Sequence, residues 1–217
     1  MRFIEKKDIP DFFKEDTKNF KSWNDYNDSD ETKKNRIKLK EYILTNEQKF
    51  LCVYCECKVN LELSHIEHLK PKEIYSDLTF DYNNLVVSCN GQCLREPSID
   101  MKNHRCGHKK NNKFDEDKFL NPIELEDIDQ YFNYDFDDYK IISSDKNKNK
   151  SSYMIDLLQL NEGNITLRRQ KTLESFNKYM KKFQDKEIRK AKIKEAIETV
   201  SVAFVSLIKA KYSRYLD

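Results

Sequence analysis

The chain has 217 residues and a net charge of +2, with 38% hydrophobic, 36% charged and 12% aromatic residues. Disordered chains are poor in aromatic residues, so this composition argues against disorder and predicts a hydrophobic core under a heavily charged surface. Only three glycines and four prolines are present, which argues against a glycine-rich parallel β architecture and favours helices joined by polar turns.

The first 49 residues are expected to form a mainly helical extension. Asp30 can cap a helix over residues 31–48. The apolar face of this helix is predicted to carry Ile37, Tyr42, Ile43 and Leu44. The segment 50–113 differs in character, because short β-like runs and turns replace the helical periodicity there.

The second half of the chain is predicted to contain a short β region followed by helices. The run 139–142 indicates one or two strands, and residues 145–152 are interpreted as a polar connector. A helix is expected from Thr166 to about Phe183, and a longer one from Lys186 to the C-terminus. This last helix has an apolar stripe that either packs against the chain's own helices or docks onto a partner. The stripe comprises Ile193, Ile197, Val200, Phe204, Leu207 and Ile208.

Charge is distributed unevenly along the chain. Residues 115–139 contain ten acids and one lysine, whereas residues 140–217 contain eighteen bases and nine acids. Nucleic-acid binding requires a local positive face rather than a high overall charge, so the near-neutral total excludes no nucleic-acid partner. The acidic block could mark a self-masking surface or a contact with a partner.

The chain is expected to be cytoplasmic. Residues 1–4 lead directly into charged residues, without the apolar segment of a signal peptide. The longest apolar stretch near the C-terminus, 196–208, is too short and too polar to span a bilayer, so no membrane association is expected. In the reducing cytoplasm, six cysteines favour metal binding over disulfides.

Every cysteine and histidine of the chain lies within one stretch of 57 residues, which predicts a metal-binding module. The two-residue gap between Cys52 and Cys55 allows both thiolates to reach one tetrahedral ion from a tight turn. A second pair must come from further along the chain, and Cys89 with Cys106 or Cys93 can supply it. Four such cysteines would hold a structural Zn²⁺.

The segments between and after these cysteine pairs contain the groups that phosphodiester hydrolysis requires. This reaction needs a base that takes a proton from water and a cation that stabilises the phosphorane. A histidine suits the first task, because imidazole titrates near neutrality. A carboxylate, an amide oxygen or a second imidazole can hold one Mg²⁺-like ion and leave positions open for phosphate and water.

The chain resembles the HNH endonucleases, because the three elements of the HNH motif occur in the family's order inside a four-cysteine frame. These elements are Glu67-His68, Asn84-Leu85 and Cys106-x-His108. The phrases QKFLCVYCE (48–56) and IEHLKPK (66–72) are further similar to the HNH subunits of Septu-type and retron-linked bacterial anti-phage systems, which are called PtuB-like. The resemblance covers most of the chain and is strongest over residues 48–122.

The resemblance implies an α+β, mainly helical fold, in which a ββα-metal nuclease core with a four-cysteine zinc knuckle is flanked by N- and C-terminal helices. The implied organisation is a helical extension at 1–49, the nuclease core with its zinc site at 50–122, and an acidic linker followed by a C-terminal helical region at 123–217. The zinc ligands would be Cys52, Cys55, Cys89 and Cys106.

The family also implies a role for each motif residue. His68 would be the general base that activates water, and Glu67 and His108 would be ligands of a catalytic divalent cation, Mg²⁺ or Mn²⁺. Asn84 would hold the loop that positions His68, or contribute a metal contact. His65 is an extra imidazole three residues before His68. On a strand the two would lie on opposite faces, whereas on a turn His65 could compete for the metal.

Other residues of the cluster have plainer interpretations. Cys57 is interpreted as a bystander, His65 as a structural hydrogen-bonding histidine, and His104 as a solvated loop residue. A run of bases without an acid is usually a solvated face, but beside a phosphodiester-cleaving site it would contact backbone phosphates. The bases of this run are Lys102, Arg105, Lys109, Lys110 and Lys113.

The predicted function is metal-dependent hydrolysis of phosphodiester bonds in DNA or tRNA. The resemblance implies the effector subunit of an anti-phage complex that works beside an ABC-type ATPase (PtuA-like). The first alternative is a zinc-ribbon-like module that binds nucleic acid or protein without cleavage, which would have no use for the HNH residues. The second is a structural or inhibitory subunit with a decayed motif, against which the presence of all three elements argues.

Overall fold

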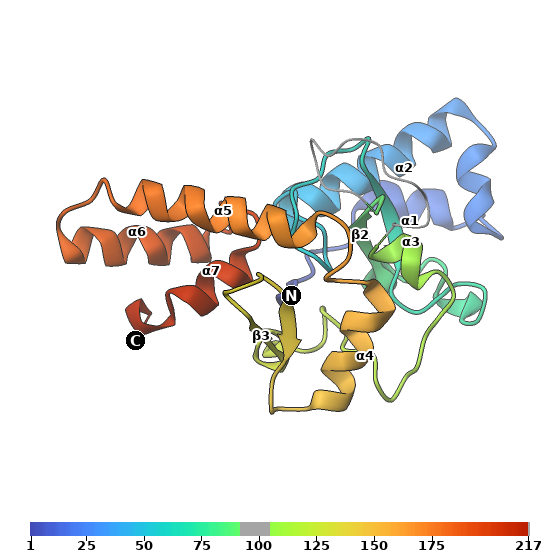
Figure 1. The fold of residues 1–217 in the computed structure, drawn as a ribbon. Helices are drawn as coiled ribbons and strands as arrows, with labels where there is room; N and C mark the ends of the chain where they lie inside the picture. The colour runs from blue at the N-terminus through green and yellow to red at the C-terminus, as the bar shows by residue number, and fades with distance from the viewer. Residues whose placement is uncertain (92–104, 217) are drawn as a thin grey trace.

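The computed structural model describes residues 1–91 and 105–216, and Figure 1 shows its helices and two small sheets. The helices of the described residues are α1 (Asp11–Thr17), α2 (Asp30–Ile43), α3 (Gly107–Lys110), α4 (Lys148–Leu158), α5 (Ile165–Met180), α6 (Lys186–Glu198) and α7 (Val205–Lys211). The strands are β1 (Ser64–His68), β2 (Leu85–Cys89), β3 (Phe132–Tyr134) and β4 (Ile141–Ser143). The expected mixed, helix-rich architecture is confirmed at this level.

Each sheet is an antiparallel pair. In the first sheet His65 lies opposite Ser88 and Glu67 opposite Val86. The second sheet pairs β3 with β4, which agrees with the strands expected near residue 140. Neither sheet is large, so the core is completed by buried side chains from the helices and from the loops between the elements.

The first sheet is anchored to α2 through the π-helical segment Leu44–Gln48 that follows this helix. Every residue of β2 is buried, as expected for the apolar run Leu-Val-Val-Ser-Cys. The buried Gln48 side chain takes the place of a further strand at β2: its amide nitrogen donates to the Val87 carbonyl oxygen (2.8 Å), and its amide oxygen accepts from the Val87 nitrogen (2.7 Å). Because both backbone groups of Val87 are satisfied, the edge of β2 can be buried at little cost.

The predicted helix over 31–48 is present, but two details of the prediction were wrong. Ser29 rather than Asp30 is the N-cap, since its hydroxyl accepts from the Thr32 nitrogen. Ile37 is 48% exposed, and Leu39 is buried in its place. The rest of the predicted face lies toward the core, because Ile43 and Leu44 are fully buried and Tyr42 is half-buried.

The C-terminal region differs from the sequence prediction in two places. The polar run 145–152 is largely helical, because Asn147 caps α4 by accepting from the Lys150 nitrogen. The long helix expected from Lys186 is broken between α6 and α7, where Val200 and Phe204 have positive φ values of 51° and 53°.

The apolar stripe predicted for this helix packs within the chain despite the break. Ile193, Phe204, Leu207 and Ile208 are buried among its own helices. Figure 1 shows α5 and α6 as a hairpin that extends away from the two sheets. None of the helices in the described part of the chain is long and apolar enough to cross a membrane.

Candidate functional site

Four cysteines from three separate segments converge beside the first sheet. Cys52 and Cys55 lie on a turn before β1, Cys89 ends β2, and Cys106 immediately precedes α3. Their four sulfur atoms lie within 4.8 Å of one another, and those of Cys55 and Cys89 are 3.9 Å apart. Ligands around a tetrahedral zinc with Zn–S bonds of roughly 2.3 Å are roughly 3.8 Å apart, so the cluster fits a structural zinc.

The thiols of the cluster have unequal pKa values. Hydrogen bonds from the neighbouring Cys106 and Cys52 lower the pKa of the Cys89 thiol to about 5, whereas burial raises the pKa of Cys52. The backbone nitrogen of Cys89 donates to the Cys52 sulfur (3.3 Å), which would stabilise a thiolate there. Cys57 is buried nearby but is not one of the four converging sulfurs, and Cys93 lies outside the described residues.

His68, at the end of β1, is held in one tautomer. Its Nε2 lies 3.0 Å from the carbonyl oxygen of Thr79, and because a carbonyl can only accept, Nε2 carries the proton. Burial lowers the pKa of His68 below its ordinary value, so the imidazole is neutral near pH 7. The remaining nitrogen, Nδ1, then has a lone pair that can accept a proton, as a general base requires.

Asn84 holds together the loop between β1 and β2. Its amide oxygen accepts from the Lys70 nitrogen (2.7 Å), and its amide nitrogen donates to the carbonyl oxygens of Lys70 (3.0 Å) and Leu78 (3.1 Å). This loop contains Thr79, which orients His68. Of the two roles that the HNH resemblance implied for Asn84, these bonds favour the loop-holding one.

Changing Asn84 to aspartate is expected to lower the free energy of unfolding by about 1–3 kcal/mol, the cost of leaving buried hydrogen-bonding groups unsatisfied. Two carbonyls would lose their donor and face a carboxylate. Urea unfolding followed by circular dichroism measures the effect, with Asn83→Asp as the control because Asn83 is exposed. Equal losses in the two variants would contradict the assigned role.

Glu67 is a buried carboxylate whose two oxygens have different partners. Oε1 lies 2.9 Å from the Lys110 ammonium and accepts from the Tyr54 hydroxyl (3.3 Å), whereas Oε2 faces His65 Nε2 at 3.3 Å. Burial opposes its ionisation, but the hydrogen bond from His65 and the charge of Lys110 outweigh burial and lower the pKa of Glu67. A charged carboxylate therefore lies at the centre of the site.

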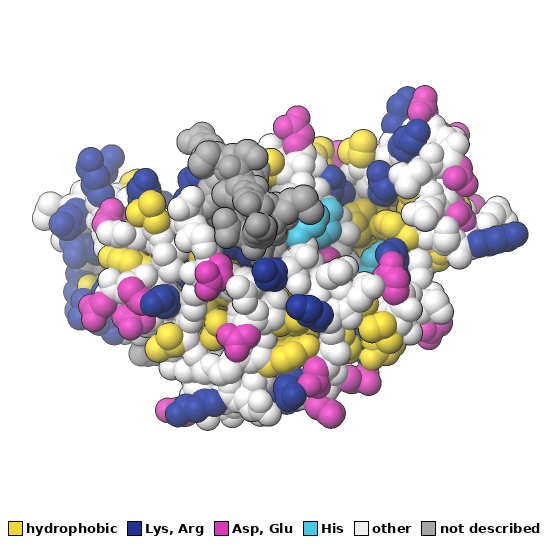
Figure 2. All heavy atoms as spheres, turned by 45° about the vertical axis from the view of Figure 1, so that its right-hand side comes forward, with side chains coloured by type: hydrophobic (Ala, Val, Ile, Leu, Met, Phe, Trp, Pro, Cys, Tyr) yellow, Lys and Arg dark blue, Asp and Glu magenta, His cyan; other side chains and the backbone are white. Residues whose placement is uncertain are grey.

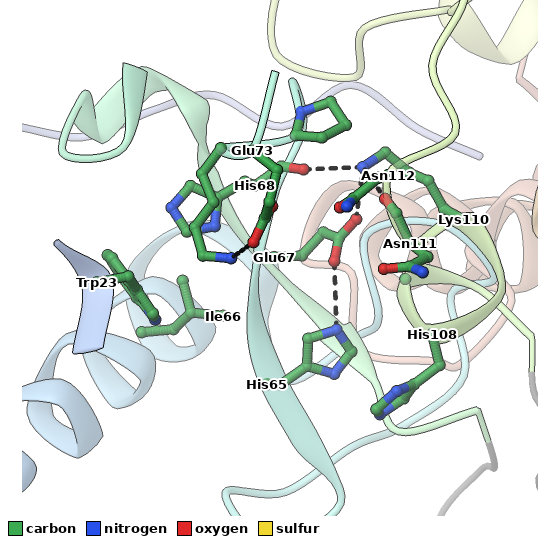
Figure 3. A pocket seen from close by; sticks show the side chains of 13 residues that line it. Trp23, His65, Ile66, Glu67, His68, Glu73, His108, Lys110, Asn111 and Asn112 are labelled. Carbon is green, nitrogen blue, oxygen red and sulfur yellow. Dashed lines mark hydrogen bonds and ion pairs between the residues drawn. The ribbon is translucent and has the colours of Figure 1, made fainter. Parts of the chain in front are cut away.

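One cavity of about 300 Å³ is lined by Glu67, His68 and His108 of the motif, together with His65. Figure 3 shows Glu67 and His65 pointing toward each other, with His108 beside His65. The rings of His65 and His108 are 4.5 Å apart. In the described part of the chain, the four cysteines are the only group of three or more metal-binding residues whose ligand atoms converge. The structure therefore does not bring Glu67 and His108 together with a third such residue.

Gly107 makes room for this arrangement. A Cβ atom at Gly107 would lie 2.6 Å from Oε2 of Glu67 and 2.7 Å from Nε2 of His65. Both distances are shorter than non-bonded atoms tolerate, so any side chain here must displace the carboxylate or the imidazole. The glycine of the Cys-Gly-His element is thus required by close packing at the site.

We expect Gly107→Ala to weaken binding of a divalent cation roughly 10–100-fold, the usual effect of disturbing the groups that orient metal ligands. The cysteine cluster should keep its capacity to bind a metal ion, because the change leaves all four thiols in place. Manganese titration and zinc content of the same sample test both statements. An unchanged manganese affinity would refute the packing argument.

The bases predicted to contact nucleic acid occupy different environments. Arg105 and Lys110 are at most 1% exposed, so the prediction that they contact phosphate was wrong for these two. Lys110 donates instead to the backbone oxygen of His68 (2.9 Å) and pairs with Glu67, joining the two site residues. Lys109 is half-buried and Lys113 exposed, and Lys102, like His104, lies outside the described residues.

Trp23 is a site residue that sequence reasoning missed. Its ring contacts that of His68 edge-on, with centroids 4.7 Å apart, and it lines the same cavity. Trp23 lies in a short 3₁₀ helix, Trp23–Asn27, far from the motif in the sequence, and no local pattern indicates this contact. Figure 2 shows histidine side chains, in cyan, that reach the surface of the molecule.

No protein-family model matches the chain. It is 32% identical over 130 residues to the "Retron Vc95 putative HNH endonuclease" of Vibrio cholerae, a match that covers 57% of this chain and 58% of that protein. It is also 42% identical over 40 residues to the Septu protein PtuB of Bacillus thuringiensis, which covers 18% of this chain and 16% of that protein. The chain thus matches little more than half the length of the first relative and a short part of the second.

One relative is named for a retron and the other for Septu, the two kinds of system that the motif phrases indicated. The resemblance seen in the sequence is therefore confirmed, and the chain is similar to the HNH nucleases of bacterial retron and Septu defence systems.

Proposed function

We propose that this protein is a metal-dependent HNH endonuclease that hydrolyses phosphodiester bonds in DNA or tRNA. The observation that carries the proposal is the pairing of a neutral, oriented His68 with the charged carboxylate of Glu67 in one cavity. A binding module that only needs its zinc has no use for this arrangement. The proposed ββα-metal core consists of β1, β2 and α3, which follow one another in this order along the chain.

The proposed mechanism assigns the proton transfer to His68. Thr79 fixes its tautomer, so that Nδ1 can take the proton of the attacking water as the phosphorus–oxygen bond forms. A divalent cation bound at Glu67 would stabilise charge on the phosphorane and on the leaving oxygen. Lys110 keeps Glu67 charged and ties it to the backbone of His68, so that base and carboxylate hold a fixed separation.

Further contacts with nucleic acid and with a partner belong to the same proposal. Lys109 and Lys113, on and just after α3, are the remaining described bases of the predicted run. They are adjacent in the sequence to His108 and Asn112, which line the cavity. The similarity to the Septu protein PtuB agrees with the resemblance stated from the motif phrases. On that resemblance, the protein would act as the effector of an anti-phage complex in the cytoplasm, beside an ABC-type ATPase.

Cleavage of supercoiled plasmid and of total tRNA by the purified protein tests the proposal. The reactions contain Mg²⁺ or Mn²⁺, with and without the proposed ABC-type ATPase partner, and EDTA in a parallel set. Cation-dependent cleavage of either polymer supports the proposal and identifies the substrate class. Binding of nucleic acid without cleavage in every reaction, including those with the ATPase, would refute it in favour of a zinc-ribbon-like binding module.

A further inference from the structure

His65 shares a face of β1 with Glu67 rather than with His68. Successive side chains of a strand alternate between faces, so residues two apart lie together and residues three apart do not. The structure follows this rule, with Nε2 of His65 3.3 Å from Oε2 of Glu67. His65 is therefore placed beside the carboxylate that would bind a cation.

The amide of Asn90 determines which nitrogen of His65 is available. The Asn90 amide nitrogen donates to the carbonyl oxygen of Glu62 (3.0 Å), so its oxygen must be the atom that lies 3.0 Å from Nδ1 of His65. Nδ1 consequently carries a proton and donates it. A metal-binding histidine is commonly oriented in this way by an acceptor on its other nitrogen. Nε2, the nitrogen facing Glu67, is the one left to bind a metal.

The carboxylate of Glu67 is divided in a corresponding way. Oε1 is occupied by Lys110 and Tyr54, which leaves Oε2 directed at His65. Two adjacent ligands of an octahedral Mg²⁺, with bonds of about 2.1 Å, are roughly 3 Å apart. The observed 3.3 Å between Nε2 and Oε2 is close to this value. Gly107 leaves both atoms room, since it has no Cβ to occupy the space beside them.

His108, which the HNH resemblance implied as the nitrogen ligand, is placed less directly. It is exposed, and its ring lies beside the ring of His65. Its ligand atoms do not complete a convergent set with Glu67 and His65 in the described part of the chain. The nitrogen atom poised at the carboxylate is that of His65.

We propose that His65 is a ligand of the catalytic cation, which it binds through Nε2 together with Oε2 of Glu67. The cation replaces the proton shared between these two atoms, and that proton passes to solvent. The inference rests on the proposed metal-dependent function and adds a ligand to it. It also explains why an extra imidazole precedes the HNH motif.

Binding of Mn²⁺ to the zinc-loaded protein tests this assignment without a cleavage assay. Continuous-wave electron paramagnetic resonance counts bound Mn²⁺, and pulsed measurements detect the ¹⁴N coupling of a coordinated imidazole. The wild type should bind one Mn²⁺ with this coupling. His108→Ala should keep the coupling, whereas the double variant with His65→Ala should lose it and bind Mn²⁺ at least tenfold more weakly than His108→Ala alone.

Three outcomes would overturn the assignment. The first is loss of the nitrogen coupling in His108→Ala alone, and the second is its persistence in the double variant. The third is the absence of Mn²⁺ binding by a wild type that retains its zinc, which together with the absence of cleavage would also refute the proposed function. In the first two outcomes, cation-dependent cleavage by the wild type leaves the proposed function standing. His65→Gln replaces His65→Ala if the alanine variant does not fold by circular dichroism.

Discussion

Replacing His68 by alanine is expected to lower the rate of nucleic-acid cleavage by roughly 10²–10⁴-fold, the usual contribution of a positioned general base. The alanine variant lacks the Nδ1 lone pair that accepts the proton from water. Its zinc and its fold should be retained, because His68 is neither one of the clustered cysteines nor part of the Asn84 hydrogen bonds. Initial rates under single-turnover conditions give the comparison.

His68→Gln separates the chemical role of this residue from its structural role. A glutamine amide can still donate to the Thr79 carbonyl but cannot act as a base near pH 7. We expect the glutamine variant to be as inactive as the alanine variant. Retention of more than about a tenth of the wild-type rate by His68→Gln would show that the base lies elsewhere.

The pH dependence of cleavage follows from the same side chain. Burial lowers the pKa of His68 from its ordinary value of 6.5, and only the neutral imidazole can accept a proton. With the cation saturating at every pH, so that displacement of the His65 proton does not limit the rate, the rate should therefore fall to half only below pH 6.5. A midpoint above pH 6.5 would contradict the assignment of His68 in its buried environment as the base.

Loss of the zinc is expected to unfold the protein. In small metal-binding modules, zinc binding contributes on the order of 10 kcal/mol to folding. The net stability of a whole domain is only about 5–15 kcal/mol. The variants Cys89→Ser and Cys106→Ser should therefore be unfolded already at 25 °C and show no cooperative thermal transition. Both residues are completely buried, and each connects a different segment to the cluster.

Cys57→Ser is the matched control for the zinc prediction. Cys57 is as deeply buried as the four clustered cysteines, but its sulfur is not among the four that converge. This variant should bind one zinc per chain and unfold cooperatively. Metal content by mass spectrometry and thermal unfolding by circular dichroism test all three variants. A folded, zinc-free wild type would refute a structural role for the metal.

The parts of the site that sequence predicts well are those with a local spacing rule. A two-residue gap between cysteines indicated the first half of the cluster, and the structure places Cys89 and Cys106 with this first pair. The alternation of a strand separates His65 from His68, as anticipated. The same rule also places His65 beside Glu67, a consequence visible in the sequence once β1 is assigned.

Other features depend on contacts between distant segments and could not be predicted. Lys110 belongs to a run of bases that is typical of a solvated face. In the structure it is buried, where it pairs with Glu67 and donates to the carbonyl oxygen of His68. In the break before α7, Phe204 has a positive φ, a conformation that a bulky side chain disfavours. This conformation is accompanied by a tertiary hydrogen bond, in which the Phe204 nitrogen donates to the carbonyl oxygen of Glu56 (2.9 Å). Both outcomes are decided by tertiary structure, which overrides the local pattern.

The edge-on contact between Trp23 and His68 gives the protein a built-in optical probe. The chain contains a single tryptophan, so all of its indole fluorescence comes from a ring 4.7 Å from the proposed base. Protonated imidazole quenches indole emission, and displacement of the ring by a bound phosphate would shift the emission wavelength. Titration of the base and occupation of the cavity can therefore be followed in unlabelled protein on the millisecond timescale of stopped flow.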